Sequence, residues 1–318
     1  MVGPVLDRVC EKRYNVNYNG IRGPSFCGIR TMTIASSRTI HEHRTEGEAL
    51  RVSARLSGSY NTNPAAVLTG RAKARYVSGM FGRIARRYDL MNTLMTFGQD
   101  ARWRRYTAEQ ARPRPGGLAL DVATGTGRLA RELARKGART LAVDFSPEMM
   151  LVGVRGQGPG VRGQDRRQTL TPDPWPLTPI YFIGGDALEL PFADSTFDCV
   201  TSGFAMRNVV DISAAFREMH RVVKPGGRVV CLEVGRPRWA VARALHAFYT
   251  GKIVPLLGRL VAGDADAYTY LPNSMRRFPP PEELARIMWA AGLRDVRFRQ
   301  LTFGAVAVHS GVKKDDGS

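Results

Sequence analysis

LALDVATGTGRLARELARK, residues 118–136, joins a short apolar run, a glycine-rich turn and a segment of helical character. The apolar run predicts a buried strand over 118–123, and the segment after the turn predicts a helix over 128–136. Gly125 and Gly127 let backbone N–H groups approach a ligand closely, and the amino end of the helix adds positive partial charge that suits an anion. A strand–turn–helix unit that holds a nucleotide-like ligand is therefore predicted, and a tight turn without a ligand is the alternative.

Strands and helices alternate through most of the remaining chain. Helices are expected at 80–95, 100–112, 212–223 and 282–291, and another is expected to begin at Pro147 with Ser146 as its N-cap. Strands are expected at 140–144, 180–183, 197–203, 228–234, 296–301 and 305–310. A turn is expected at 224–227. This alternation implies parallel βαβ units. We predict an α/β, Rossmann-like fold: a doubly wound, mostly parallel sheet with an antiparallel edge pair and a helical cap.

Composition shifts divide the chain into an extension and one domain. Residues 1–75 lack sustained periodicity, and the stretch from Lys12 to Ile40 contains no acidic residue. Such a segment is expected to be a disordered extension, with a transit peptide or a start codon placed too early as alternatives. The domain is expected over 76–315, interrupted at about 154–178 by a Gly/Pro-rich insertion that repeats VRGQ.

Charge and cysteine content exclude several classes of protein. The net charge is +19, but only seven of the basic residues are lysine and the arginines are scattered, so nucleic-acid binding is not expected from charge alone. The four cysteines form no CxxC pair or Cys/His cluster, so neither a metal site nor a disulfide framework is predicted. The longest apolar stretch, 240–263, is interrupted by charged residues and is not expected to span a membrane.

Carboxylates follow two of the expected strands. Asp144 comes 23 residues after Asp121 and ends the second strand, where a carboxylate can accept hydrogen bonds from both ribose hydroxyls. Taken alone, this arrangement also fits a dinucleotide-binding turn. Four later segments follow one another in an order that resembles class I S-adenosylmethionine-dependent methyltransferases. They are Gly185-Asp186-Ala187, Leu190-Pro191-Phe192, 197–200 and 224–227.

Further motifs narrow the resemblance. Four segments are similar to motifs of the ubiquinone/menaquinone biosynthesis C-methyltransferase family: MFGRIARRYDLMN (80–92), FAMRNV (204–209), Glu233-Val234 and YLPNS (270–274). The similarity runs from about Tyr76 to Lys313 and excludes the insertion. Two residues depart from the family pattern: Arg128 replaces an acid that usually follows the GTG turn, and Gly82 replaces an Asp.

The resemblance implies a cofactor, a substrate and a set of site residues. The cofactor would be S-adenosylmethionine, and the substrate a prenylated quinol, demethylmenaquinol first and 2-methoxy-6-polyprenyl-1,4-benzoquinol second. The cofactor-binding residues would be Asp121, Gly125, Thr126, Gly127, Asp144, Asp186 and Ala187. Asp186 would bind the adenine amino edge, and the Ala187 N–H a ring nitrogen. A class I methyltransferase that acts on RNA or on another small molecule is the alternative.

Two residues beyond the fourth strand are candidates for catalysis. Arg207 and Asn208 fall at the carboxyl edge of the sheet, where such folds place ligands. Arg207 would stabilise the phenolate of a deprotonated quinol, and Asn208 would hydrogen-bond the substrate. A purely structural ion pair is the alternative for Arg207.

Helical spacing of apolar residues between Leu245 and Val261, beside Arg243, Lys252 and Arg259, fits an amphipathic helix in the plane of a membrane surface. The alternative is a lid helix whose apolar side packs on the sheet or lines a pocket for the prenyl tail. We expect a cytoplasmic protein with weak, salt-sensitive contact to the inner face of the membrane. The sequence leaves open whether the chain forms a homo-oligomer.

Overall fold

The computed structural model describes residues 70–156, 180–237, 239–254, 270, 274–275 and 277–315. Residues 1–69, which hold most of the expected extension, lie outside the described residues. So do residues 157–179, which hold most of the insertion expected at about 154–178, and residues 255–269, which include the second half of the amphipathic segment expected between Leu245 and Val261.

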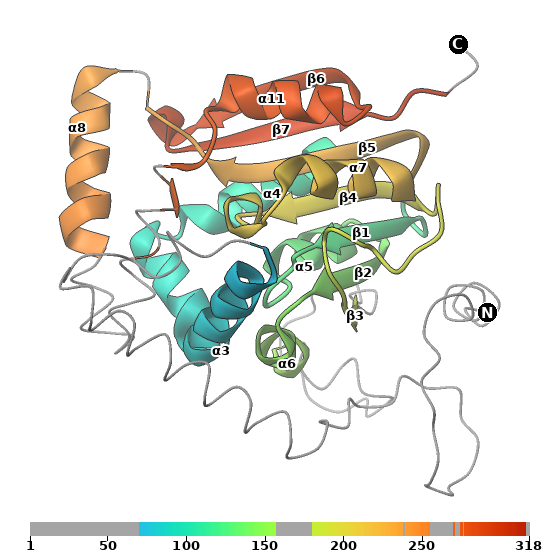
Figure 1. Ribbon diagram of the computed structural model, residues 1–318, viewed down its shortest axis with the longest axis horizontal. Helices are drawn as coiled ribbons and strands as arrows, with labels where there is room; N and C mark the ends of the chain where they lie inside the picture. Colours follow the sequence, from blue (N-terminus) through green and yellow to red (C-terminus); the bar gives the residue numbers. More distant parts are fainter. Residues whose placement is uncertain are drawn as a thin grey trace, which may run out of the picture. The chain divides into compact units, whose positions relative to one another are not determined.

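A seven-stranded sheet with the order β3-β2-β1-β4-β5-β7-β6 forms the centre of the fold (Figure 1). Its strands are β1 (Leu118–Val122), β2 (Arg139–Asp144), β3 (Ile180–Gly184), β4 (Phe197–Gly203), β5 (Val223–Val234), β6 (Arg294–Leu301) and β7 (Val306–Val312). The five strands from β3 to β5 pair in parallel, whereas β7 pairs antiparallel with both β5 and β6. The predicted mostly parallel sheet with an antiparallel edge pair is confirmed.

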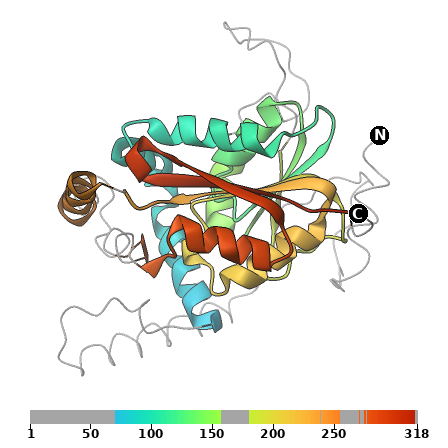
Figure 2. The same ribbon diagram turned by 90° about the horizontal axis from the view of Figure 1, so that it is seen from above.

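Helices cover both faces of the sheet. They are α3 (Gly70–Met95), α4 (Gln99–Ala111), α5 (Arg128–Arg135), α6 (Pro147–Arg155), α7 (Ile212–Val222), α8 (Ala240–Phe248) and α11 (Pro281–Ala290), with short helical turns η3 (Met206–Asn208), η4 (Tyr249–Ile253) and η6 (Thr302–Gly304). Figure 2 shows α4 on one side of the sheet and α7 with α11 on the other. Trp103 of α4 and Leu129 and Leu133 of α5 pack in one core cluster with Val230 and Leu232 of β5.

Local sequence accounts for the start of α6. The Ser146 side chain accepts a hydrogen bond from the backbone N–H of Met149 at 3.4 Å, and Pro147 occupies the first helical position. Both features are as predicted. Serine is favoured at this position because its side chain satisfies one of the free N–H groups of the first turn.

Several element boundaries differ from the predictions by one or two residues, and three further differences are more substantial. Helix α3 begins at Gly70, ten residues before the expected start, because the preceding turns are rich in good helix formers. Helix α6 continues to Arg155, so the first residues of the expected insertion are helical. Residues 224–227, expected to be a turn, lie within β5 as an irregularity of its pairing with β4, where Gly226 has a φ of +74° and donates its N–H to the Lys313 carbonyl at 2.7 Å.

Candidate active site

A cavity opens at the carboxyl ends of β1 to β4, the edge where parallel sheets bind ligands. We call it the glycine-loop cavity. Its walls come from the turn after β1 (123–126), the start of α6 (144–146 and 149), the segment after β3 (185–188), the segment after β4 (203–205 and 208–210) and the helices α3 (77, 78, 81 and 88), α4 (104) and α5 (128). The cavity brings together six of the residues predicted from the sequence. Five were predicted to contact the cofactor, namely Gly125, Thr126, Asp144, Asp186 and Ala187, and Asn208 was predicted to contact the substrate.

The carboxylate of Asp144 organises the entrance to the glycine-rich turn. Its Oδ2 accepts the N–H of Gly125 at 2.6 Å, and its Oδ1 accepts the N–H of Ser146 at 2.8 Å. Burial raises the pKa of Asp144, while hydrogen bonds from the backbone of Ser146, Gly125 and Phe145 act in the opposite direction. Because a carboxylate oxygen has two lone pairs, each oxygen can accept a further hydrogen bond from a ligand in the cavity.

Asp121 and Gly127 support the turn from behind and are not among the residues that line the cavity. Asp121 is 1 % exposed and accepts hydrogen bonds from the hydroxyls of Thr124 at 2.6 Å and Thr201 at 2.7 Å. Its pKa is raised to about 6 by burial, against the effect of these two hydrogen bonds. Gly127 has a φ of +77°, and a Cβ there would lie 2.6 Å from the Phe182 ring. Both residues therefore shape the loop that a ligand would meet.

The segment after β3 forms an opposite wall of the same cavity. Asp186 accepts the N–H of Leu188 through Oδ1 at 2.9 Å, which closes a tight turn around Ala187. Phe145, Met149 and Leu188 add apolar surface to the cavity lining. Apolar side chains combined with a few directed polar groups are typical of sites that hold a flat heterocycle such as adenine.

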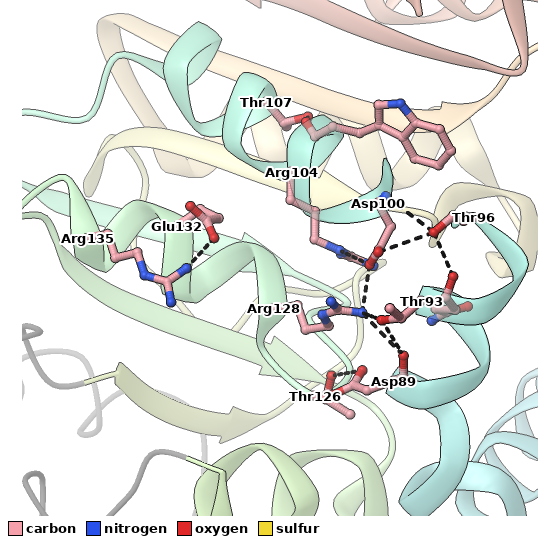
Figure 3. A network of polar contacts seen from close by, with 12 residues as sticks. Asp89, Thr93, Thr96, Asp100, Arg104, Thr107, Thr126, Arg128, Glu132 and Arg135 are labelled. Atoms are coloured by element: carbon pink, nitrogen blue, oxygen red, sulfur yellow. Dashed lines mark hydrogen bonds and ion pairs between the residues drawn. The ribbon is translucent and has the colours of Figure 1, made fainter. Parts of the chain in front are cut away.

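Polar contacts tie the glycine-rich turn to the corner between α3 and α4 (Figure 3). The Thr126 hydroxyl donates to Asp89 Oδ1 at 2.8 Å. Arg128 Nη1 lies 2.6 Å from Asp100 Oδ2 and also donates to the Asp89 carbonyl at 3.4 Å and to the Thr93 hydroxyl at 3.2 Å. Arg128 is thus held by Asp100, which is 1 % exposed, and this contact explains how a cation is accommodated at the amino end of α5.

A second cavity adjoins the first, and we call it the apolar cavity. The two share Tyr88, Arg104 and Phe204. Its lining is mostly apolar and includes Met95, Phe97, Trp103, Tyr249, Val254, Val306 and the polar side chains of Asn92, Gln99 and Arg207. Phe204 has a φ of +59°, which is strained for a non-glycine residue, and its ring lies within 5.4 Å of the Arg104 guanidinium carbon and 5.7 Å of that of Arg207.

Arg207 and Asn208 face different cavities. Arg207 lines the apolar cavity, where Nη1 lies 3.2 Å from Glu233 Oε2 and both side chains are almost fully buried. The Arg207 backbone N–H also donates to Glu233 Oε1 at 3.4 Å. Asn208 lines the glycine-loop cavity and accepts a hydrogen bond from the Tyr270 hydroxyl at 3.2 Å. The structural ion pair considered for Arg207 is present, and it holds the guanidinium at the wall of a cavity.

Sequence patterns missed Arg104, which lines both cavities and is only 6 % exposed. Its position four residues after Asp100 on α4 places the two side chains on one helix face, with Nε 3.6 Å from Asp100 Oδ2. This Asp–Arg spacing, in a helix otherwise rich in arginine, is the signal that could have identified it.

The expectations about metal, cysteine and membrane spans were made for the whole sequence, and the structure bears on them only for the described residues. In that part of the chain no group of three or more His, Cys, Asp or Glu side chains is placed to hold a metal ion. Cys199 and Cys231 are buried free thiols, and burial raises the pKa of Cys199 to about 12. Among the described helices, none combines the length and apolar character that crossing a bilayer requires.

Comparison with known proteins places this geometry in a family. A SAM-dependent methyltransferase from Thermotoga maritima has the same fold, with a TM-score of 0.50 and 20% identity over 74% of this chain and 99% of that one. Two proteins named demethylmenaquinone methyltransferase are closer in sequence: one from Roseiflexus sp. (strain RS-1) is 50% identical over 244 residues, 76% of this chain and 95% of that protein. The other, from Mycobacterium marinum, is 42% identical over 239 residues, 75% and 94% of the two chains. The sequence model of the ubiE/COQ5 methyltransferase family matches residues 69–313, and this chain belongs to that family of S-adenosylmethionine-dependent methyltransferases.

Proposed function

We propose that this protein transfers a methyl group from S-adenosylmethionine to a ring carbon of demethylmenaquinol and so forms menaquinol. The observation that carries the proposal is the pair of adjoining cavities, one with nucleotide-binding features and one largely apolar, which meet at Tyr88, Arg104 and Phe204. The names of the relatives from Roseiflexus and Mycobacterium support demethylmenaquinol as the substrate.

The glycine-loop cavity fits the cofactor by the chemistry of its lining. We assign the ribose hydroxyls to Asp144, the adenine edge to Asp186 and the Ala187 N–H, and the flat faces of the ring to apolar side chains such as Phe145. Gly125 and Thr126 bring the backbone close to the ligand. When bound, S-adenosylmethionine supplies a methyl group already activated by its sulfonium, so the protein contributes chiefly by holding the two reactants in line.

Replacing Asp144 with alanine is expected to weaken S-adenosylhomocysteine binding by about 1.5–3 kcal/mol, because the cofactor loses a charged acceptor. Loss of the contact to Gly125 N–H also loosens the turn. Titration calorimetry measures the change, with the exposed Glu283→Ala variant on α11 as the control for removal of a carboxylate. An unchanged dissociation constant in folded Asp144→Ala protein would contradict the placement of the ribose.

We assign the quinol ring to the junction of the cavities and its prenyl tail to the apolar cavity. The ring carbon becomes nucleophilic when the neighbouring hydroxyl loses its proton to a water molecule or another base, and the carbon releases its own proton after the new C–C bond has formed. Arg207 would stabilise the phenolate electrostatically, with Glu233 fixing the guanidinium, and Asn208 would hydrogen-bond the other oxygen. Arg207 and Asn208 therefore remain our candidates for catalysis.

Incubation of the purified full chain with methyl-labelled S-adenosylmethionine and reduced demethylmenaquinone tests the substrate. The label is expected in menaquinol after chromatographic separation of the products. Parallel reactions contain 2-methoxy-6-polyprenyl-1,4-benzoquinol or transfer RNA, which test the two alternatives. Absence of label in the naphthoquinol, under conditions where calorimetry detects cofactor binding, would refute the substrate assignment while the family membership stands.

We further propose that the rim of the apolar cavity touches the membrane surface. Phe97, which lines this cavity, is 80 % exposed, and Phe303, which follows Thr302 of the lining, is 76 % exposed. Trp239 contacts Phe303 with 6.2 Å between ring centroids. Leu245 and Phe248 of α8 are also exposed, so this described half of the expected amphipathic segment does not pack on the sheet. Exposed aromatic rings at the mouth of a cavity for a prenylated ligand are suited to the headgroup region of a bilayer. We keep the cytoplasmic location, with weak contact to the inner face of the membrane, as part of this proposal.

The Trp239→Ser variant is expected to co-sediment less with anionic liposomes and to show a higher KM for a long-chain quinol than the unmodified protein. The KM for a short-chain, water-soluble quinol is expected to stay the same, because only the tail needs the membrane. Trp289→Ser removes a comparably exposed indole from α11 and is the matched control. Equal losses in the two variants would contradict a specific membrane-facing rim.

A further inference from the structure

A second group of polar hollows lies at the opposite, amino-terminal edge of the sheet. One hollow, which we call the arginine groove, is lined by Arg112, Arg228, Arg297 and Arg299 together with neutral groups that include Gln110 and Ser310. Arg228 pairs with Val312 at the end of β7, and β6 begins there with Arg294. Figure 1 shows this end of β7 on the side of the sheet away from α8. The groove is therefore separate from both cavities of the proposed active site.

A neighbouring hollow continues the groove and shares two of its arginines. Arg112 and Arg228 line both spaces, and Arg114 and Lys224 line the second one. Among the described residues, Asp198 is the one carboxylate in its lining, and it is already engaged: Oδ1 accepts from Lys224 Nζ at 2.8 Å and Oδ2 from the Leu118 N–H at 2.7 Å. Asp198 consequently leaves the arginine charges largely uncompensated.

Positive charge accumulates here without ion-pair partners. The ion pairs found among the described residues include none of the arginines at 112, 114, 228, 297 and 299, and Asp295 is the single acidic residue in the lining of the groove. The pKa of Arg228 is lowered by burial and then by the charges of Arg112 and Arg297, with Asp295 acting in the opposite direction. Repulsion among these guanidinium groups disfavours the empty groove, and a bound anion would relieve it.

The groove also offers the donor types that recognise phosphoryl groups. A guanidinium presents paired N–H donors that match phosphate oxygens, and several arginines face one space here. Gln110 and Ser310 add neutral donors to the same lining. Arg299 is held over the Tyr106 ring, 5.5 Å from its centroid, which fixes one wall.

We infer that the two hollows bind a small soluble anion with two or more linked phosphoryl groups, one group in each hollow, with Arg112 and Arg228 contacting both. The shared arginines between adjoining spaces favour linked phosphoryl groups over a single phosphate. The position at the amino-terminal edge, away from the aromatic rim, favours a soluble ligand over a lipid headgroup. This inference does not depend on the proposed substrate of methyl transfer.

Titration of the full chain with inorganic pyrophosphate and tripolyphosphate, at constant ionic strength, tests the inference by calorimetry and thermal unfolding. Saturable binding of one anion per chain and a higher Tm are expected. Arg228→Gln is expected to weaken this binding at least about tenfold, since a charge-assisted contact is lost. Arg286→Gln, which removes an exposed arginine from α11, is the matched control and is expected to bind as the unmodified protein does.

Without added anion, Arg228→Gln is expected to unfold at the same or a higher temperature, because repulsion with Arg112 and Arg297 is relieved. Retained S-adenosylhomocysteine binding shows that the variant is folded. Three outcomes would each overturn the inference. Arg286→Gln could weaken pyrophosphate binding as much as Arg228→Gln does, the binding could fail to saturate, or the protein could bind an RNA oligonucleotide but not pyrophosphate. Binding to phosphatidylglycerol vesicles that depends on Arg228, without binding of pyrophosphate, would overturn the soluble ligand in favour of a lipid headgroup.

Discussion

Arg207→Met is expected to lower the free energy of unfolding by about 3–5 kcal/mol, because it leaves the buried Glu233 carboxylate without its counter-ion. Glu233 is 0 % exposed and cannot recover this loss by hydration. Urea denaturation followed by circular dichroism measures the change. Arg286→Met on the surface of α11 controls for loss of an arginine side chain and is expected to change stability little.

A double variant separates the structural role of Arg207 from its proposed role in the reaction. Arg207→Met combined with Glu233→Gln removes both charges, so most of the lost stability is expected to return. Turnover of the quinol is expected to stay low in the double variant, with kcat reduced more than KM, because the phenolate lacks its stabilising charge. Recovery of both stability and kcat would show that the ion pair is only structural.

Arg128→Met is expected to destabilise the protein by about 3 kcal/mol, since Asp100 is buried and would keep only the more distant Arg104 as a cationic neighbour. Weaker S-adenosylhomocysteine binding is expected as well, because Arg128 and the Thr126–Asp89 hydrogen bond together fix the glycine-rich turn against α3. Denaturant unfolding and calorimetry measure the two effects separately.

Arg128→Lys is expected to recover part of the stability, because an ammonium keeps the charge that meets Asp100 but does not reproduce the position of Nη1, the one nitrogen through which Arg128 contacts Asp100, Thr93 and the Asp89 carbonyl. Addition of Asp100→Asn to Arg128→Met is expected to restore stability more fully than it restores cofactor binding. Unaltered stability in Arg128→Met would mean that the contact with Asp100 contributes nothing to the fold.

Local sequence was sufficient for the order of elements and for the type of site. Three features depend only on residues that are close together in the sequence, and the structure contains all of them. They are the apolar run, glycine turn and helix at 118–136, the alternation of strands and helices that follows, and the Ser146-Pro147 start of α6. Asp144 and Asp186 could be placed beside the turn because parallel strands bring their carboxyl ends to one edge. The family motifs added the methyltransferase class, which periodicity alone leaves open.

Short-range patterns of hydrophobicity and turn chemistry thus specify the strands, helices and loops that form the sheet and its cofactor edge, and the family motifs specify the methyltransferase class. Contacts between distant parts of the folded chain set the rest: Asp121 supports the turn while Asp144 faces the cavity, Arg128 meets Asp100, and Arg207 pairs with Glu233. These contacts join residues 19–80 positions apart in the sequence. Their partners are set by the pairing of β4 with β1 and with β5 and by the packing of α4 against α5, and burial there makes a neighbouring opposite charge necessary. No local pattern of the sequence records these neighbours.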